Sequence, residues 1–200
     1  PKIKDDGSFE TTFSGFYPAY IIKIEAPGYE PAFGDRVDAL AGNTVEQVYR
    51  LTKGHNIEGT LLLPNGDPAL GAKIYLATST DELRLRGTQI PDSPNALSAT
   101  TDGRGHFTFD PQSTPFGLFV TSDDGYAAIS SADLAKNGGK IALTPWARVE
   151  GVVKQNGTPV PNANLLAQYQ KAAPLSVDGG PPITLFIPVQ ADASGKYVIE

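Results

Sequence analysis

The only imidazoles in the chain are those of His55 and His106, so any reaction that needs a histidine base would have to use one of them. His106 falls in a turn motif whose later copy has Lys196 at that position, and His55 falls in a junction whose later copy has Ala147. A position that changes identity between copies is poorly suited to shared catalysis. We therefore predict that both histidines are solvent-exposed bystanders rather than a base with its orienting group.

Carboxylates beside glycines are the other candidate ligands. Asp5-Asp6, Asp102 and Asp123-Asp124 all lie near glycine, where an Asp side chain commonly accepts bonds from nearby backbone N–H groups and shapes a turn. None of them has the Asp-x-Asp-x-Asp-Gly spacing of a calcium loop. The chain has no cysteine, which excludes disulfides, thiol nucleophiles and thiolate zinc sites. We predict structural turns, with no metal and no cofactor.

Sequence motifs of catalysis are also missing. The chain contains no Gly-x-Ser-x-Gly, Ser-x-x-Lys or His-Glu-x-x-His motif, no phosphate loop and no dinucleotide fingerprint. We therefore predict no catalytic residues and no enzymatic activity.

Aromatic residues offer two further candidates. The stretch 13–20 holds Phe13, Phe16, Tyr17 and Tyr20, which could stack on sugar rings or on a partner peptide. Packing within a strand and over a domain end is the alternative, and we favour it. Trp146 is the single tryptophan and lies in a junction at 143–149. We predict that it wedges neighbouring domains together rather than binding a ligand.

Composition limits the class of protein. The net charge of −6 and a pI near 4.9 argue against binding to nucleic acid. No apolar stretch reaches the roughly 18 residues of a membrane span, so we expect no direct membrane insertion. The 21 Gly and 17 Pro residues favour many short strands joined by turns. Because the chain starts at Pro1 and has no Met, we expect it to be a piece of a longer protein.

Internal repeats determine the organisation. Residues 57–74 match residues 149–165, and residues 102–107 match 192–197, with a weaker copy at 5–9. Gly125-Tyr126 matches Gly28-Tyr29, and Leu143-Thr144 matches Leu51-Thr52. The copies are 90 to 97 residues apart, which is the size of a small domain. We therefore predict the second half of a domain at 1–54, a whole domain at 55–145 and the first half of another at 146–200.

Each unit shows the alternating pattern of short strands. Asn65-Gly66 and Asn156-Gly157 predict hairpin turns of type I′, in which both central residues have positive φ. A short helix is predicted at 130–138, with Ser130 as its N-cap and Gly138 past its end. The long connections at 77–99 and 167–190 predict an additional edge strand and a loop. The fold class is therefore all-β, with tandem β-sandwich domains of about 90 residues and at most one short helix per unit.

This order of motifs resembles the carboxypeptidase regulatory-like domain, a relative of the transthyretin-like and collagen-adhesin B-type sandwiches. The resemblance implies a Greek-key β-sandwich and a non-catalytic role as an accessory or repeat module of secreted and envelope proteins. It covers essentially the whole chain, but its motifs say little about a ligand. The residues that carry it are Gly59, Gly66, Pro68, Ala72, Asp102, Gly105, Phe107, Gly125 and Tyr126, with Gly151, Gly157, Pro159, Ala163, Asp192, Gly195 and Tyr197 in the next copy.

We therefore expect a tandem repeat of a bacterial secreted or cell-surface protein that acts as a spacer, scaffold or adhesion module. Its partners would be neighbouring repeats and a protein or glycan at the cell surface. One alternative is a module that binds carbohydrate or peptide through the long loops or the aromatic stretch, and another is regulation of a linked enzyme. The half-domains at the two ends would either continue into further chain, which we favour, or pair between molecules.

Overall fold

A computed structural model describes residues 2–13, 17–38, 44–78, 83–86, 96–168 and 183–199. The chain divides into two compact units, Pro1–His55 and Asn56–Glu200. The structure is mostly β, with 44% strand, several small sheets and one short helix in the part described. This agrees with the predicted all-β class. The three-part domain division remains a prediction.

The first unit contains short strand pairs and little core. β1 (Ala19–Tyr20) pairs with β4 (Val37–Asp38), and β2 (Lys23–Ile24) pairs with β3 (Ala32–Phe33), both antiparallel. The segment 44–52 has no assigned strand, although exposed and half-buried residues alternate along it. Several large apolar side chains of this unit are exposed, namely Ile3, Phe13, Tyr17, Ile21, Tyr29, Phe33, Val45 and Val48.

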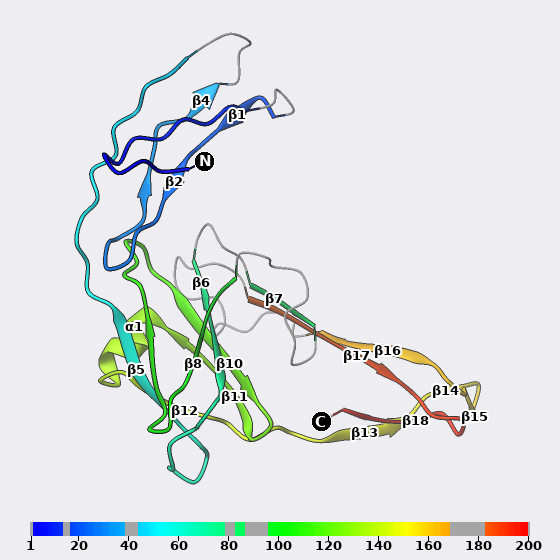
Figure 1. The fold of residues 1–200 in the computed structure, drawn as a ribbon. Helices are drawn as coiled ribbons and strands as arrows, with labels where there is room; N and C mark the ends of the chain where they lie inside the picture. Colours follow the sequence, from blue (N-terminus) through cyan, green and yellow to red (C-terminus); the bar gives the residue numbers. More distant parts are fainter. Residues whose placement is uncertain are drawn as a thin grey trace. The chain divides into compact units, whose positions relative to one another are not determined.

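Residues 56–145 form two larger sheets (Figure 1). The three-stranded sheet has the order β12-β5-β9, and the four-stranded sheet has the order β11-β10-β6-β8. All neighbours in these two sheets are antiparallel except β12 and β5. The strands are β5 (Ile57–Leu62), β6 (Lys73–Ala77), β8 (Leu97–Thr100), β9 (His106–Phe109), β10 (Gly117–Ser122), β11 (Gly125–Ser130) and β12 (Lys140–Ala142).

One hydrophobic cluster draws on both of these sheets. Alternation along each strand places every second side chain on the same face, and these faces supply the cluster together with Leu134 of the helix. Burial of such side chains is the main favourable term in folding. Its buried members are Ile57, Leu61, Ala69, Ala72, Ile74, Leu76, Phe107, Phe109, Leu118, Val120, Ala127, Leu134, Ile141 and Leu143.

A second cluster uses the other face of β6 and β10. Tyr75, Ala77 and Phe119 pack there with Leu83, which is only 1% exposed. Leu83 begins β7 (Leu83–Arg86), a strand within the long connection at 77–99, where an extra strand was predicted. The strand therefore exists, and its first side chain buries an outer face that would otherwise meet water.

The helix α1 (Ser131–Lys136) lies within the predicted range 130–138. Ser130 caps it, because its side chain accepts a hydrogen bond from the backbone N–H of Asp133. Gly138 and Gly139 follow with positive φ and end it. Leu134 is the helical residue that faces the core. Within the described residues, no helix is long and apolar enough to cross a membrane.

Residues 146–199 form narrower ladders (Figure 1). β13 (Val149–Val152) pairs with β18 (Lys196–Ile199), and β14 (Lys154–Gln155) pairs with β15 (Thr158–Pro159). β16 (Asn164–Gln168) pairs with β17 (Ile183–Gln190). β17 also pairs in parallel with β7, from Ile183 opposite Leu83 to Phe186 opposite Arg86. The extra strand of one long connection thus pairs with a strand of the next.

The two Asn-Gly turns differ from each other. At Asn156-Gly157 both residues have positive φ, 50° and 85°, as predicted. At Asn65-Gly66 only Gly66 does, so the type I′ prediction is wrong there. The N–H of Gly66 donates to the Leu63 carbonyl and the N–H of Leu63 donates to the Asp67 carbonyl. This is the pattern of a type I turn followed by a glycine bulge, and Pro64 favours it because its ring fixes φ near −65°.

Candidate functional site

A glycine faces an aromatic ring at the same place in both repeats. Gly59 lies opposite Phe107 between β5 and β9, and Gly151 lies opposite Tyr197 between β13 and β18. A Cβ at Gly59 would come within 2.5 Å of the Phe107 ring, and one at Gly151 within 2.7 Å of the Tyr197 hydroxyl. Each glycine therefore leaves the space that the partner's ring occupies.

An aspartate shapes the turn that leads into each aromatic residue. The Oδ1 of Asp102 accepts hydrogen bonds from the N–H groups of Arg104 and His106, at 2.8 and 2.9 Å. The Oδ1 of Asp192 accepts them from the N–H groups of Ser194 and Lys196, at 2.7 and 2.9 Å. Both aspartates thus organise the local backbone, which is the structural role predicted for Asp102.

The same hydrogen bonds lower the pKa of both carboxyl groups. For Asp102 the main causes are the bonds from the backbone of His106 and then of Arg104. For Asp192 the main cause is the bond from the Ser194 hydroxyl, followed by the bonds from the backbone of Lys196 and Ser194. Bonds to the charged form favour that form. At neutral pH these carboxylates are therefore ionised acceptors.

This lowered pKa predicts a pH dependence of stability. A carboxyl group with a lowered folded-state pKa stabilises the fold above its unfolded pKa, about 3.9 for Asp, and this contribution is lost as the pH falls through the folded pKa. Asp102→Asn keeps an oxygen acceptor but does not titrate. We expect the variant to have a lower urea midpoint at pH 7, and the difference to shrink towards pH 3. A difference that stays constant across this range, measured by circular dichroism, would contradict the assignment.

A second glycine brings this turn against the neighbouring strand. Gly105 and Gly195 have φ of 74° and 77°. The carbonyl of Gly105 accepts from the N–H of Leu61, and the carbonyl of Gly195 accepts from the N–H of Val153. In the weaker copy the N–H of Lys4 donates to the Ser8 carbonyl and the N–H of Gly7 to the Lys4 carbonyl, as Asp102 and Gly105 donate in their turn, and Gly7 has φ 82°. Lys4 stands where the other copies have Asp, but the Oδ1 of Asp6 accepts from the N–H of Ser8 at 2.9 Å, so this copy caps its turn from another position.

The other predicted motif residues also lie in turns or ladders. Leu62 bridges to Pro68, and Lys154 pairs with Pro159. Ala72 is buried in the main cluster, while the Ala163 carbonyl accepts from the N–H of Ala191. Gly66 and Gly157 supply the positive φ of the two hairpins. These motif residues therefore shape turns and strand pairing.

Trp146 packs on the hairpin between β10 and β11. Its ring centroid lies 5.0 Å from that of Tyr126, and its Nε1–H donates to the Ser122 carbonyl at 2.8 Å. Tyr126 also exchanges two backbone hydrogen bonds with Thr144, and a Cβ at Gly125 would meet the Thr144 carbonyl. These contacts hold the start of the junction at 143–149 against the domain that precedes it.

Sequence reasoning missed the role of Thr101. This residue is 3% exposed, and its hydroxyl donates to the Ala69 carbonyl at 2.5 Å and accepts from the N–H of Ala72 at 2.9 Å. It ties the turn before β6 to the strand β8. The sequence does place a threonine directly before Asp102 of the repeated motif. The next copy has Ala191 at this position, so Thr101 did not stand out as a repeated residue.

Both histidines are exposed, His55 in the junction and His106 on β9. Phe107, the neighbour of His106, points into the core, so alternation turns the imidazole outward. Among the described residues, no group of three or more His, Asp or Glu side chains could hold a metal ion. The arrangement brings no base and nucleophile together at these positions.

The aromatic stretch 13–20 contains stacked rings. Phe13 and Tyr20 are stacked with centroids 4.1 Å apart, and Tyr17 meets Tyr20 edge-on at 6.2 Å. Tyr17 is 60% exposed. Residues 14–16, including Phe16, lie outside the described residues, as do most of the long loops at 77–99 and 167–190. Phe13 and Tyr20 therefore pack on each other, and the interpretation of the whole stretch as cover for a domain end stays a prediction.

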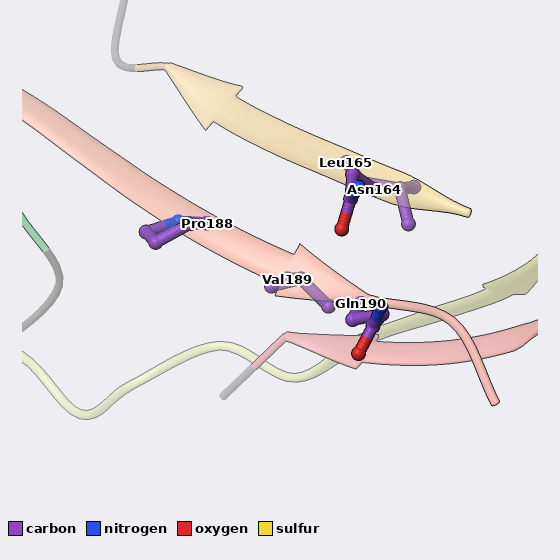
Figure 2. Close-up of a pocket in the computed structure, with 5 residues that line it drawn as sticks. All are labelled: Asn164, Leu165, Pro188, Val189 and Gln190. Atoms are coloured by element: carbon purple, nitrogen blue, oxygen red, sulfur yellow. The ribbon is translucent and has the colours of Figure 1, made fainter. Parts of the chain in front are cut away.

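A surface hollow lies along the ladder between β16 and β17 (Figure 2). Its lining comes from two adjacent strands, with Asn164 directly opposite Gln190 in the register. The Gln190 side chain donates to the Asn162 carbonyl at 3.5 Å. The remaining lining residues are Leu165, Pro188 and Val189. The two amide side chains offer hydrogen bonds, and the lining contains no ionisable group that could act as an acid or a base.

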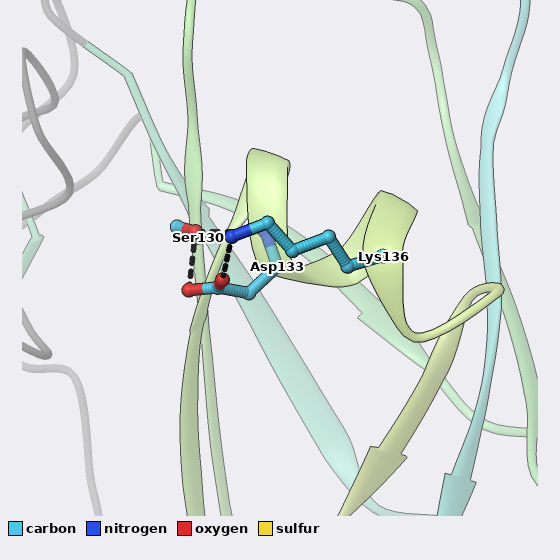
Figure 3. A network of polar contacts seen from close by, with 3 residues as sticks. All are labelled: Ser130, Asp133 and Lys136. Atoms are coloured by element: carbon cyan, nitrogen blue, oxygen red, sulfur yellow. Dashed lines mark hydrogen bonds and ion pairs between the residues drawn. The ribbon is translucent and has the colours of Figure 1, made fainter.

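A polar network caps α1 (Figure 3). The Ser130 hydroxyl donates to Asp133 at 2.8 Å, and the Lys136 ammonium approaches the other oxygen of Asp133 at 3.2 Å. The bond from Ser130 and then the one from Lys136 lower the pKa of Asp133. Asp133 and Lys136 are exposed, and Ser130 is the half-buried N-cap at the end of β11, so the network stabilises the first turns of the helix.

Comparisons with protein families, with curated proteins and with solved structures found no match for this chain.

Proposed function

We propose that the chain is a non-catalytic tandem repeat of β-sandwich domains that serves as a spacer or adhesion scaffold in a bacterial secreted or cell-surface protein. The observation that carries the proposal is the repeated constellation of glycine, aromatic ring and aspartate turn. It recurs in the same strand register in two segments about 90 residues apart. A repeated structural unit without a convergent polar site is suited to spanning distance.

The sandwich architecture within this proposal is supported by residues 56–145. Two sheets of three and four strands contribute to one hydrophobic cluster, as two packed sheets do in a sandwich. The resemblance to carboxypeptidase regulatory-like domains adds the Greek-key connection and the extracellular or envelope location. Neighbouring repeats are then the first partners, and a surface protein or glycan is the next.

Stiffness of the junction is what a spacer needs. The segment 143–149 is short, contains Pro145, and begins with the contacts of Trp146 to Tyr126 and Ser122. An aromatic pair of this kind, tilted by 31°, contributes on the order of 1 kcal/mol beyond its buried area. The proposed scaffold role therefore depends more on the Trp146 ring than on the exposed side chains of the junction.

We expect Trp146→Ala to loosen the junction at 144–149, while the ladder between β7 and β17 still joins the segments before and after it. In the wild type, ¹⁵N relaxation should give one rotational correlation time for both segments, and in the variant the amides of residues 144–149 should show larger fast motions than in the wild type. Trp146→Phe is the matched control, because it keeps a ring and loses only the indole N–H. Independent tumbling in the wild type would rule out the rigid spacer.

Binding of glycan or peptide, and regulation of a linked enzyme, remain hypotheses from the sequence. The exposed Tyr17 ring is the best candidate surface for the first.

A further inference from the structure

The chain contains three Asn-Gly steps, and each lies in a turn that the structure describes. They are Asn65-Gly66 between β5 and β6, Asn137-Gly138 after α1, and Asn156-Gly157 between β14 and β15. The side-chain carbonyl carbon of Asn lies within reach of the backbone nitrogen of the next residue, and attack within one chain is favoured over attack by a separate molecule. A following glycine has no Cβ to obstruct the approach. The three steps therefore share one reactive sequence and differ in their surroundings.

At Asn65-Gly66 both reacting groups are engaged in hydrogen bonds. The N–H of Gly66 donates to the Leu63 carbonyl at 2.9 Å. The Asn65 side chain donates to the Oδ2 of Asp67 at 2.8 Å and accepts from the N–H of Asp67 at 3.0 Å. The turn is also anchored, because Ala69 shortly after it is buried in the main cluster. Attack by the glycine nitrogen would have to break these bonds first.

The step Asn137-Gly138 is held by the end of the helix. The N–H of Gly138 donates to the Ala135 carbonyl at 3.1 Å, and the N–H of Asn137 donates to the Asp133 carbonyl at 2.9 Å. Leu134 of the same helix is 5% exposed and packs in the main cluster. The glycine nitrogen is therefore available only after this end of the helix has opened.

The step Asn156-Gly157 has no such restraint. Among the described residues, neither the N–H of Gly157 nor the Asn156 side chain has a hydrogen-bond partner. The flanking strands β14 and β15 have two residues each, and all four residues are exposed. A turn on so short and exposed a ladder opens locally at little cost in free energy. The geometry needed for attack is thus more accessible here than at the other two steps.

We propose that Asn156 is a modification site of this chain, at which the side-chain amide is lost without an enzyme, faster than at the other two Asn-Gly steps. The nitrogen of Gly157 forms a bond to Cγ of Asn156, the bond from Cγ to Nδ2 breaks, and ammonia leaves with the proton of the glycine nitrogen. Water then opens the cyclic imide. Cleavage between Cγ and the nitrogen gives aspartate, and cleavage between the backbone carbonyl carbon and the nitrogen gives isoaspartate.

The isoaspartate product would change the hairpin. Its main chain runs through Cβ and Cγ, so the turn becomes longer, and either product places a negative charge where the amide was neutral. A type I′ turn fits a loop of two residues between paired strands, so the longer turn no longer matches the pairing of Gln155 with Thr158. We expect the change to stay within β14 and β15, because the N–H of Val160 still donates to the Val153 carbonyl. The inference goes beyond the spacer role and does not depend on it.

Peptide mapping by mass spectrometry tests the proposal on the whole wild-type chain, incubated in mildly alkaline buffer. Each Asn-Gly step lies in a different part of the sequence, so the other two serve as internal controls. We expect Asn156 to be converted several-fold faster than Asn65 and Asn137, with isoaspartate separated from aspartate by chromatography. Asn156→Gln has a longer side chain, which disfavours ring closure, so this variant should lose the modification at 156 and keep the rates at the other two steps.

Incubation in concentrated urea shows whether the fold sets the order of the three rates. The unfolded chain gives the three steps similar surroundings, so their rates should converge there. Equal rates in the folded chain, or a faster reaction at Asn65 or Asn137, would overturn the proposal. An order that persists unchanged in urea would overturn it as well, because the preference would then come from the neighbouring residues in the sequence and not from the hydrogen bonds of the turns.

Discussion

Replacing Phe107 with alanine is expected to destabilise the 56–145 region by about 3–5 kcal/mol, the usual loss for a buried phenylalanine. Phe107 is 4% exposed, meets Phe109 edge-on at 6.2 Å and fills the space over Gly59. Alanine would leave a cavity between the two sheets. Urea unfolding followed by the fluorescence of Trp146 measures the effect, because this ring packs on Tyr126 of the same region.

Tyr197→Ala is the matched control at the equivalent repeat position. Its ring also lies over a glycine, but Tyr197 is half-buried whereas Phe107 is buried. We expect a clearly smaller loss of stability, because the ring removes less apolar area from water. Equal losses at the two positions would show that the burial of the ring does not set the loss of stability.

The second large effect is expected at Gly105. Its φ of 74° is left-handed, which costs a residue with a Cβ roughly 1–2 kcal/mol. A Cβ there would also collide with the Leu61 carbonyl, which accepts the N–H of Ala69. We expect Gly105→Ala to lower the free energy of unfolding by about 2–4 kcal/mol, since neither backbone can yield without breaking ladder bonds.

Gly103→Ala in the same turn is the control. A Cβ at Gly103 would have no atom within 4 Å, and this residue is not among those with positive φ. Its free energy of unfolding should change by no more than about 0.5 kcal/mol. Thermal and urea unfolding of both variants would decide the matter. Similar losses for the two alanines would mean that glycine is needed for general flexibility of the turn and not for the close approach at Gly105.

Several local features could be predicted because short-range chemistry dictates them. Ser130 before an apolar helical turn and glycines after it specify a capped helix. Asp followed three residues later by Gly specifies a turn in which the carboxylate binds backbone N–H groups, and the structure has it at Asp102 and Asp192. Period-two alternation specifies which side chains of β5 and β9 point inward.

The turn at Asn65-Gly66 shows where local reading fails. The same dipeptide forms a two-residue loop at Asn156-Gly157, yet the preceding Pro64 draws the first turn into a type I geometry with a glycine bulge. The dipeptide is a strong signal only when its neighbours allow both residues a positive φ. The prediction of a type I′ turn rested on Asn65-Gly66 and took no account of Pro64.

The alternating pattern of apolar residues could not predict which distant strands pair. The parallel ladder between β7 and β17 joins residues about 100 positions apart, and no local period indicates which strand a short apolar run will choose. The hydrogen bonds of the Thr101 hydroxyl also depend on a segment about 30 residues away. Such contacts arise from the packing of sheets, which is decided by the chain as a whole.

The sequence by itself determined the repeat period, the mostly β class, the inward phase of strands such as β5 and β9, and the turns built on Asp and Gly, because these depend on neighbours a few residues apart. Only the tertiary structure decided which of the inward side chains are covered. Ile57 and Val149 occupy the same position in the pattern, yet one is covered and the other is half-exposed. Burial depends on whether a second layer is present, and a strand's own residues carry no information about the layer that covers it.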